Sequence, residues 1–223
     1  MYLNADFSQR ALVRFDDNDW VDSPVPGVRR RMLDRIGEEV ARATSIVRFD
    51  RGSAFSPHTH DGGEEYLVLD GTFQDEDGDF PTGFYVRNPP TSSHTPAAME
   101  GATILVKLHQ FDPDDRTRAQ IDSRADTWSK TEPGVETLHL HSDDRESVVL
   151  ERWEPGTTRR LDASGGLEVF VIAGAVSEGT DRLTRWDWLR LPVGSEFRAT
   201  AGSEGAQIWT KSGHLRTVIE RRA

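Results

Sequence analysis

Short apolar or alternating runs, separated by Gly, Pro, Asp and Asn, are the main pattern along the chain. The clearest runs cover residues 29–33, 43–49, 65–71, 82–88 and 102–108. Their length and their content of β-branched and aromatic residues predict strands. No stretch has the apolar period of a long amphipathic helix. Several short strands at close spacing are typical of an all-β sandwich or barrel.

The pattern occurs twice in the same order. GGEEYLVLDG at 62–71 returns as GGLEVFVIAG at 165–174, and GATILVK at 101–107 returns as GAQIWTK at 205–211. Local coincidence would not preserve both spacing and order, so we interpret the chain as one β-unit that has been duplicated.

A polar, charged stretch separates the two copies and predicts the domain boundaries. We expect a first domain over residues 1–112, a linker over 113–127 and a second domain over 128–223.

Composition limits what these domains can bind. Lys and Arg number 27 and Asp and Glu number 38, which gives a net charge of −11. Such a surface repels phosphate backbones and anionic lipids, so we expect neither nucleic acid nor membrane as a partner. There is no cysteine, and any metal must therefore be held by His, Asp or Glu. Without a signal-like or membrane-spanning apolar run, we expect a cytoplasmic protein.

The candidate chemistry lies in the first copy. His58 and His60 are two residues apart, so on a strand their imidazoles leave the same face and can reach one ion. Glu64 opens the next strand after a DGG turn, and His94 follows a Pro-rich turn. Three imidazoles and one carboxylate suit a divalent transition metal rather than Ca²⁺ or Mg²⁺.

A second histidine pair provides an internal comparison. His139 and His141 also stand two apart, but Arg145 occupies the place where a carboxylate ligand would be needed. We therefore expect this pair to be structural or exposed and to bind no metal.

The spacing from Gly52 through His58, His60 and Glu64 to Gly71 matches the first cupin motif, and the segment ending at His94 looks like the second. Within the cupin superfamily, the sequence of this segment most resembles the cupin-like domain of ChrR anti-sigma factors. The resemblance implies a double-stranded β-helix, the jelly-roll barrel of cupins, here as two tandem cupin domains. It also implies zinc held by these four residues, whereas the related acetylacetone dioxygenases hold iron in a similar pocket.

Aligned on the repeat, the second copy lacks these ligands. Leu161 and Ala163 stand at the positions of His58 and His60, Leu167 replaces Glu64, and Glu196 falls near the position of His94. We therefore expect one divalent transition metal ion per chain, zinc first, with Fe, Mn, Ni and Co as the other candidates. The degenerate copy is expected to serve packing, regulation or formation of a homodimer.

Four further residues have open or structural roles. Tyr85 and Arg87 share a strand face and are candidates to line the pocket as an acid or an anion clamp, or to pack beside the strand. Glu65 should point away from Glu64 and form a structural ion pair. We interpret His109 as a strand-end histidine.

Two functions follow from these patterns. In the first, the chain senses a small molecule or oxidative stress at the metal in the first domain and acts in regulation. In the second, it is a metal-dependent dioxygenase that acts on a small diketone or related oxygen-rich compound. A sigma factor is the partner that the resemblance implies. However, ChrR binds it through a helical domain with His and Cys ligands that has no counterpart in these residues, so we expect no complex of that type.

Overall fold

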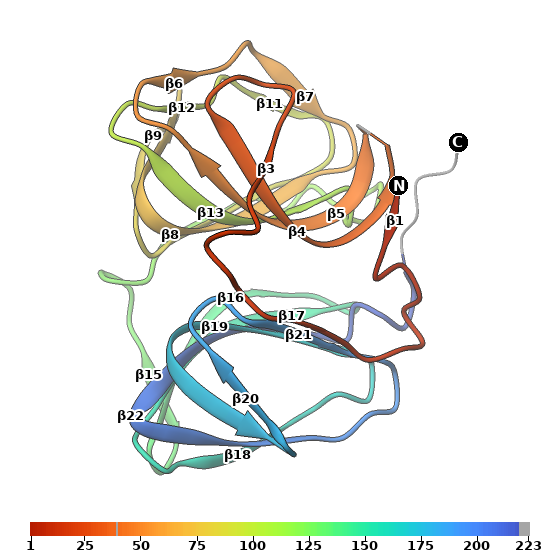
Figure 1. Ribbon diagram of the computed structural model, residues 1–223, viewed down its shortest axis with the longest axis vertical. Helices are drawn as coiled ribbons and strands as arrows, with labels where there is room; N and C mark the ends of the chain where they lie inside the picture. Colours follow the sequence, from red (N-terminus) through yellow and green to blue (C-terminus); the bar gives the residue numbers. More distant parts are fainter. Residues whose placement is uncertain (39, 219–223) are drawn as a thin grey trace. The chain divides into compact units, whose positions relative to one another are not determined.

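The computed structural model describes residues 1–38 and 40–218, which form strands β1 to β22 and no helix. Accordingly, this part of the chain contains no helix that could cross a membrane. The chain divides into two compact units (Figure 1). Unit 1 contains Met1–Ala5 and Asp17–Ala125, and unit 2 contains Asp6–Asp16 and Asp126–Val218.

Unit 1 is built around one antiparallel sheet whose strands differ in length. Its strands are paired in the order β1 (Tyr2–Leu3), β4 (Val28–Gly37), β5 (Ala41–Phe49), β13 (Ala102–Leu108), β8 (Glu64–Asp75), β10 (Phe84–Asn88) and β14 (Ala119–Asp122). The short strands that branch from it are β3 (Val21–Asp22), β6 (Ser53–Ala54), β9 (Gly78–Pro81) and β12 (Ala97–Ala98). Separately, β7 (His58–His60) pairs with β11 (Ser92–His94).

Unit 2 repeats this arrangement. Its sheet has the order β15 (Ser129–Glu132), β16 (Val135–Ser142), β17 (Ser147–Trp153), β22 (Phe197–Ser212), β19 (Leu167–Glu178), β21 (Trp188–Leu191) and β2 (Ala11–Val13). The side strands are β18 (Thr158–Leu161), which pairs with β22, and β20 (Asp181–Thr184), which pairs with β19. The corresponding strand orders support the duplication inferred from the sequence. Four of the five predicted runs lie entirely in strands, and the fifth begins in a turn at 82–83 and continues as β10.

The unit boundaries differ from the expected domain boundaries at two edge strands. The expected linker contains β14, which pairs with β10, and residues 6–16 contain β2, which pairs with β21. Each sheet is thus completed by the segment that precedes the other repeat. Edge strands are short and half solvated, so they lack the apolar run that marks a central strand. Residues 219–223 of the expected second domain lie outside the described residues.

The two faces of β8 have different environments. Tyr66 and Val68 belong to the apolar core of unit 1, together with Val86 of β10 and Val106 of β13. Glu64 lies on this same inner face because side chains alternate along a strand. Glu65 and Leu67 lie on the opposite, outer face. Between residues 64 and 68 of β8, the even-numbered side chains therefore face the barrel interior.

A close backbone approach fixes the end of the inner segment in both units. Gly71 has φ +72°, and a Cβ there would lie 2.2 Å from the carbonyl oxygen of Gly101. Gly174 has φ +71°, and its Cβ would lie 2.2 Å from the carbonyl oxygen of Gly205. Only glycine accepts both the positive φ and the contact, which explains why the last Gly of the sequence motif recurs in the second copy.

Candidate metal centre

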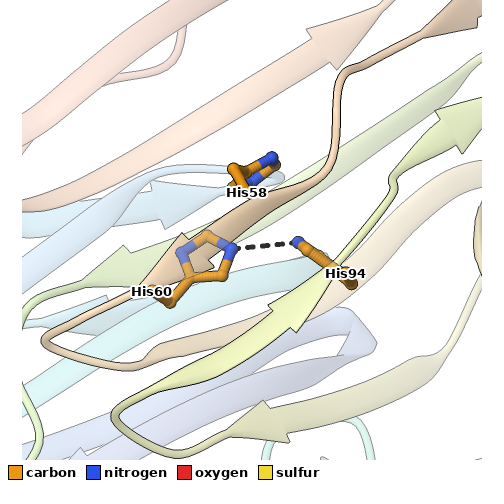
Figure 2. Close-up of side chains that lie close together, drawn as sticks. All are labelled: His58, His60 and His94. Carbon is orange, nitrogen blue, oxygen red and sulfur yellow. Dashed lines mark hydrogen bonds between the residues drawn. The ribbon is translucent and has the colours of Figure 1, made fainter.

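Two paired strands bring the histidines together. In the antiparallel register of β7 and β11, His58 lies opposite His94 and Thr59 opposite Ser93. The hydroxyls of Thr59 and Ser93 are hydrogen-bonded to each other at 2.8 Å on one side of this ribbon. Because of strand alternation, His58, His60 and His94 therefore share the other side, where their rings converge (Figure 2).

The donor atoms lie close to one another. His60 Nε2 and His94 Nε2 are 2.9 Å apart, and the Glu64 Oε2 atom lies 3.5 Å from the first and 3.6 Å from the second. The ring centroid of His58 is 4.8 Å from that of His60 and 5.0 Å from that of His94. Each of the three histidines offers a nitrogen within 4.8 Å of the others. The structure thus gathers all four residues singled out from the sequence.

These separations fit a bound transition metal. Metal–ligand bonds of about 2.1 Å place neighbouring ligand atoms about 3.0 Å apart in octahedral and about 3.4 Å apart in tetrahedral geometry. The contacts among His60, His94 and Glu64 span 2.9–3.6 Å. The donor set of imidazoles and one carboxylate suits Zn, Fe(II), Mn, Co, Ni or Cu.

Further contacts orient the side chains that could bind the ion. The Nδ1–H of His58 donates to the Ser56 carbonyl at 3.0 Å, and His94 Nδ1 lies 3.2 Å from Asp75 Oδ2. Both bonds leave Nε2 of the ring for an ion, as is usual for metal-binding histidines. Asn88 Nδ2 donates to Glu64 Oε2 at 3.3 Å. Sequence reasoning missed Asp75 and Asn88, because nothing in their local pattern shows that β8 and β10 place them beside the motif.

The environments of the histidines change their pKa values in opposite directions. Burial lowers the pKa of His60, and the charge of Glu64 opposes this only in part. Burial also favours the neutral ring of His94, but the hydrogen bond with Asp75 and the charge of Glu64 outweigh it and raise the pKa of His94. The negative charges around His94 that favour a cationic ring favour a metal cation for the same reason.

The site extends from solvent into the barrel. His58 is exposed, His60 is half-buried and His94 is buried. Glu64 is also buried. One edge of the histidine cluster can therefore be reached from outside, whereas the opposite edge faces the inner core of unit 1.

Tyr85 and Arg87 do not line this site; of the two roles left open for them, packing beside the strand is the one that their contacts favour. In the β8–β10 register Arg87 pairs with Glu65, whereas Asn88 pairs with Glu64. Tyr85 Oη donates to Glu65 Oε2 at 2.7 Å, on the outer face of the sheet. The contact agrees with the structural role expected for Glu65. The sequence showed that Tyr85 and Arg87 share a face but not which face is turned inward.

Arg87 has its own partners on the outer face. Its guanidinium donates to Asp115 at 2.6 Å and to the Thr117 carbonyl at 2.9 Å. Burial alone would raise the pKa of Asp115, but the hydrogen bonds from Arg87 and from Thr117 hold it below its ordinary value of 3.8. The pair therefore stabilises the charged forms of both residues.

His109 lies close to the turn between His60 and Glu64. Its backbone N–H donates to the Gly63 carbonyl at 3.1 Å, and its ring occupies the place where a Cβ on Gly62 would be. It is within electrostatic reach of His60. The ring thus fixes the DGG turn that leads into Glu64.

The matching positions in unit 2 are apolar. Ala163 and Leu167 are buried members of its core, Leu161 packs against that core, and Glu196 is exposed. A register shift separates His139 from His141 in β16. His139 is exposed, and His141 lies 3.3 Å from Asp143.

Comparison with known families agrees with these features. The family model of the ChrR cupin-like domain matches residues 8–112 and 116–216, which is nearly the whole chain in two copies. The chain belongs to the ChrR cupin-like family. The two matched segments begin just before β2 and β14, so each copy of this domain starts with the strand that completes the sheet of the other unit.

Solved structures confirm the double-stranded β-helix fold of this ChrR cupin-like chain. A candidate dioxygenase from Nostoc punctiforme is 15% identical with a TM-score of 0.71, over 100% of this chain and 86% of that one. A candidate glyoxylate-induced protein from Pseudomonas aeruginosa is 14% identical with a TM-score of 0.71, over 96% of this chain and 90% of that one. Oxalate decarboxylase from Bacillus subtilis, described with Mn(II) centres, is 13% identical with a TM-score of 0.62, over 89% and 76%. At these identities the likeness concerns the fold alone. No curated protein matches the chain.

Proposed function

We propose that this chain is a metal-dependent sensor of a small oxygen-bearing molecule. One divalent transition metal ion would be held by His58, His60, Glu64 and His94. The observation that carries this proposal is the approach of His60 Nε2, His94 Nε2 and Glu64 Oε2 to within 2.9–3.6 Å of one another. A metal ion shared by these side chains accounts for two imidazole nitrogens and a carboxylate oxygen that approach one point inside a barrel.

The protein residues around the donor set have defined tasks. Asp75 and Ser56 hold the imidazole rings, and Asn88 holds the Glu64 carboxylate. When bound, the ion supplies a Lewis acid to which an oxygen atom of a small molecule can be attracted. The exposed edge at His58 is the side from which such a molecule can enter.

Zinc is the metal we propose, as the resemblance to ChrR implies, and the proposed role is regulatory. In this proposal unit 1 binds the ion and unit 2 has a different, regulatory role. The apolar residues at the corresponding positions of unit 2, among them Ala163 and Leu167, support this. Unit 2 would transmit or stabilise a response, in a homodimer, rather than bind a second ion. A cytoplasmic location belongs to this proposal, whereas a sigma-factor complex of the ChrR type does not.

A metal-dependent dioxygenase is the second candidate. The exposure of His58 favours it, because Fe(II) held by these four residues would keep coordination positions free for a chelating substrate and O₂, which could reach it from this edge.

Metal analysis followed by oxygen uptake tests the choice. The protein is purified without added metal, its elements are measured, and O₂ consumption is followed with small diketones after Fe(II) loading. Stoichiometric zinc without O₂ uptake supports the sensor and excludes the dioxygenase. Stoichiometric iron with turnover excludes a purely sensory role. Failure to bind any transition metal would refute both.

A further inference from the structure

A tyrosine on the inner face of β8 carries a hydroxyl that the fold does not use. Tyr66 is 1% exposed, and its Oη has no hydrogen-bond partner among the residues that the structure describes. A buried hydroxyl without a partner destabilises the folded protein, because it has given up its hydrogen bonds to water. Phenylalanine would fill the same space without this cost, so the hydroxyl requires an explanation.

The hydroxyl belongs to the neighbourhood of the metal centre. Tyr66 follows Glu64 by two residues and shares its inner face, and it is within electrostatic reach of Glu64 and Asp75. Its ring packs edge-on against Phe73 at 5.1 Å between centroids, and Phe73 in turn lies 6.4 Å from the ring of His94. Beyond Tyr66 this face is apolar, with Val68, Val86 and Val106 in the same core cluster.

Unit 2 shows what the fold needs at this position. By strand register, Glu64, Tyr66 and Asn88 correspond to Leu167, Val169 and Leu191. Val169 is fully buried in the core of unit 2. The copy that lacks the metal-binding residues thus also lacks the tyrosine and the asparagine, and its core is closed by aliphatic side chains.

The outer face behaves in the opposite way. Glu65, Arg87 and Lys107 correspond to Glu168, Arg190 and Lys211, so the charged residues recur in both units. All of these side chains are buried. The buried outer-face residues are thus the same in both units, whereas the inner-face residues differ. This difference indicates that Tyr66 belongs to the metal centre rather than to the framework of the barrel.

We propose that Tyr66 binds the small molecule that the metal centre recognises, by donating its hydroxyl hydrogen to an oxygen of that molecule. This inference rests on the proposed function. The chemistry assigns a small carboxylate or carbonyl compound with two oxygen atoms, one directed to the ion and one to Tyr66. A short aliphatic body would face Phe73 and the valines of the core, so branched carboxylates should bind better than a dianion such as oxalate.

The test uses the full chain loaded with Co²⁺, whose visible absorption reports ligand exchange at the ion. Wild type, Tyr66→Phe and Tyr85→Phe are titrated with isobutyrate, acetate and oxalate. Tyr85→Phe is the matched control, because it removes a buried tyrosine hydroxyl on the outer face that is bonded to Glu65. We expect all three proteins to bind one Co²⁺, isobutyrate to be preferred by wild type, and Tyr66→Phe alone to bind it about tenfold more weakly.

The outcomes separate this inference from the proposed function. If wild type binds Co²⁺ but none of the probes, or if Tyr66→Phe binds isobutyrate as wild type does, the role of Tyr66 is wrong while the metal centre stands. If Tyr66→Phe loses Co²⁺ itself, the tyrosine supports the fold of the site and the inference is also overturned. If wild type binds no Co²⁺, the proposed function fails first.

Discussion

The contact between Asp75 and His94 allows a quantitative test of the metal centre without removing a ligand. Asp75 Oδ2 lies 3.2 Å from His94 Nδ1, and the two side chains are 5% and 7% exposed. In Asp75→Asn an amide oxygen can still accept from Nδ1–H, but the negative charge that strengthens the imidazole as a ligand is lost. Loss of such a partner weakens metal binding about 10–100-fold. With burial this complete, solvent screens the contact little, so we expect the upper half of that range.

The assay is a competition titration of Zn²⁺ between the protein and a chromophoric chelator. Asp79→Asn is the control, because Asp79 lies in the same β8–β9 hairpin and its carboxylate accepts from Gln74 at 2.6 Å. The control should bind Zn²⁺ as tightly as wild type. An unchanged affinity in Asp75→Asn, or an equal loss in both variants, would show that His94 is not a ligand held by Asp75.

Three further predictions address the site, a backbone constraint and an ion pair. His58→Ala should abolish metal binding and His139→Ala should leave it intact in the same titration; equal loss would overturn the ligand assignment. Gly71→Ala should destabilise the protein by at least about 2 kcal/mol in denaturant unfolding. Gly52→Ala, with φ +79° but nothing within 4 Å of its Cβ, should cost clearly less, and similar losses would mean that the approach to Gly101 is unimportant. Asp115→Asn should lower stability at pH 7 by about 1–3 kcal/mol. Because the folded pKa of Asp115 is lowered, its contribution is full above 3.8 and is lost as pH falls through the folded value. The difference between variant and wild type should therefore shrink as pH falls below 3.8, and a difference that does not change with pH would contradict it.

His58, His60 and Glu64 were accessible to sequence reasoning because their geometry is local. An HxH pair on one strand has a fixed side-chain direction, and the turn before Glu64 is too short to take that residue far away. Because the unit is duplicated, its two copies could also be compared, and only one of them has the donor set. These constraints need no knowledge of which strands pair. His94 does depend on pairing, because β11 places it opposite His58, and it was found through the resemblance to the second cupin motif.

The remaining site residues depend on strand pairing, which the sequence does not contain. Asn88 meets Glu64 only because β10 pairs with β8 in the observed register. A shift of one residue would have turned Tyr85 and Arg87 inward instead, which is one of the two arrangements that the sequence left open. The edge strands β2 and β14 were missed for a related reason, since their partners lie in the other repeat.

Comparison of the two units separates framework from function within a single chain. On the outer face, Glu65 accepts from Tyr85 at 2.7 Å and Glu168 accepts from the Trp188 indole at 3.0 Å. The aromatic donor has changed but the buried carboxylate and its bond remain, as expected for a residue that the barrel itself requires. On the inner face, the carboxylate of Glu64 has become the aliphatic side chain of Leu167. A buried carboxylate is costly without a compensating partner, so its loss where the histidines are lost supports the proposal that Glu64 and the histidines act together as ligands of one ion.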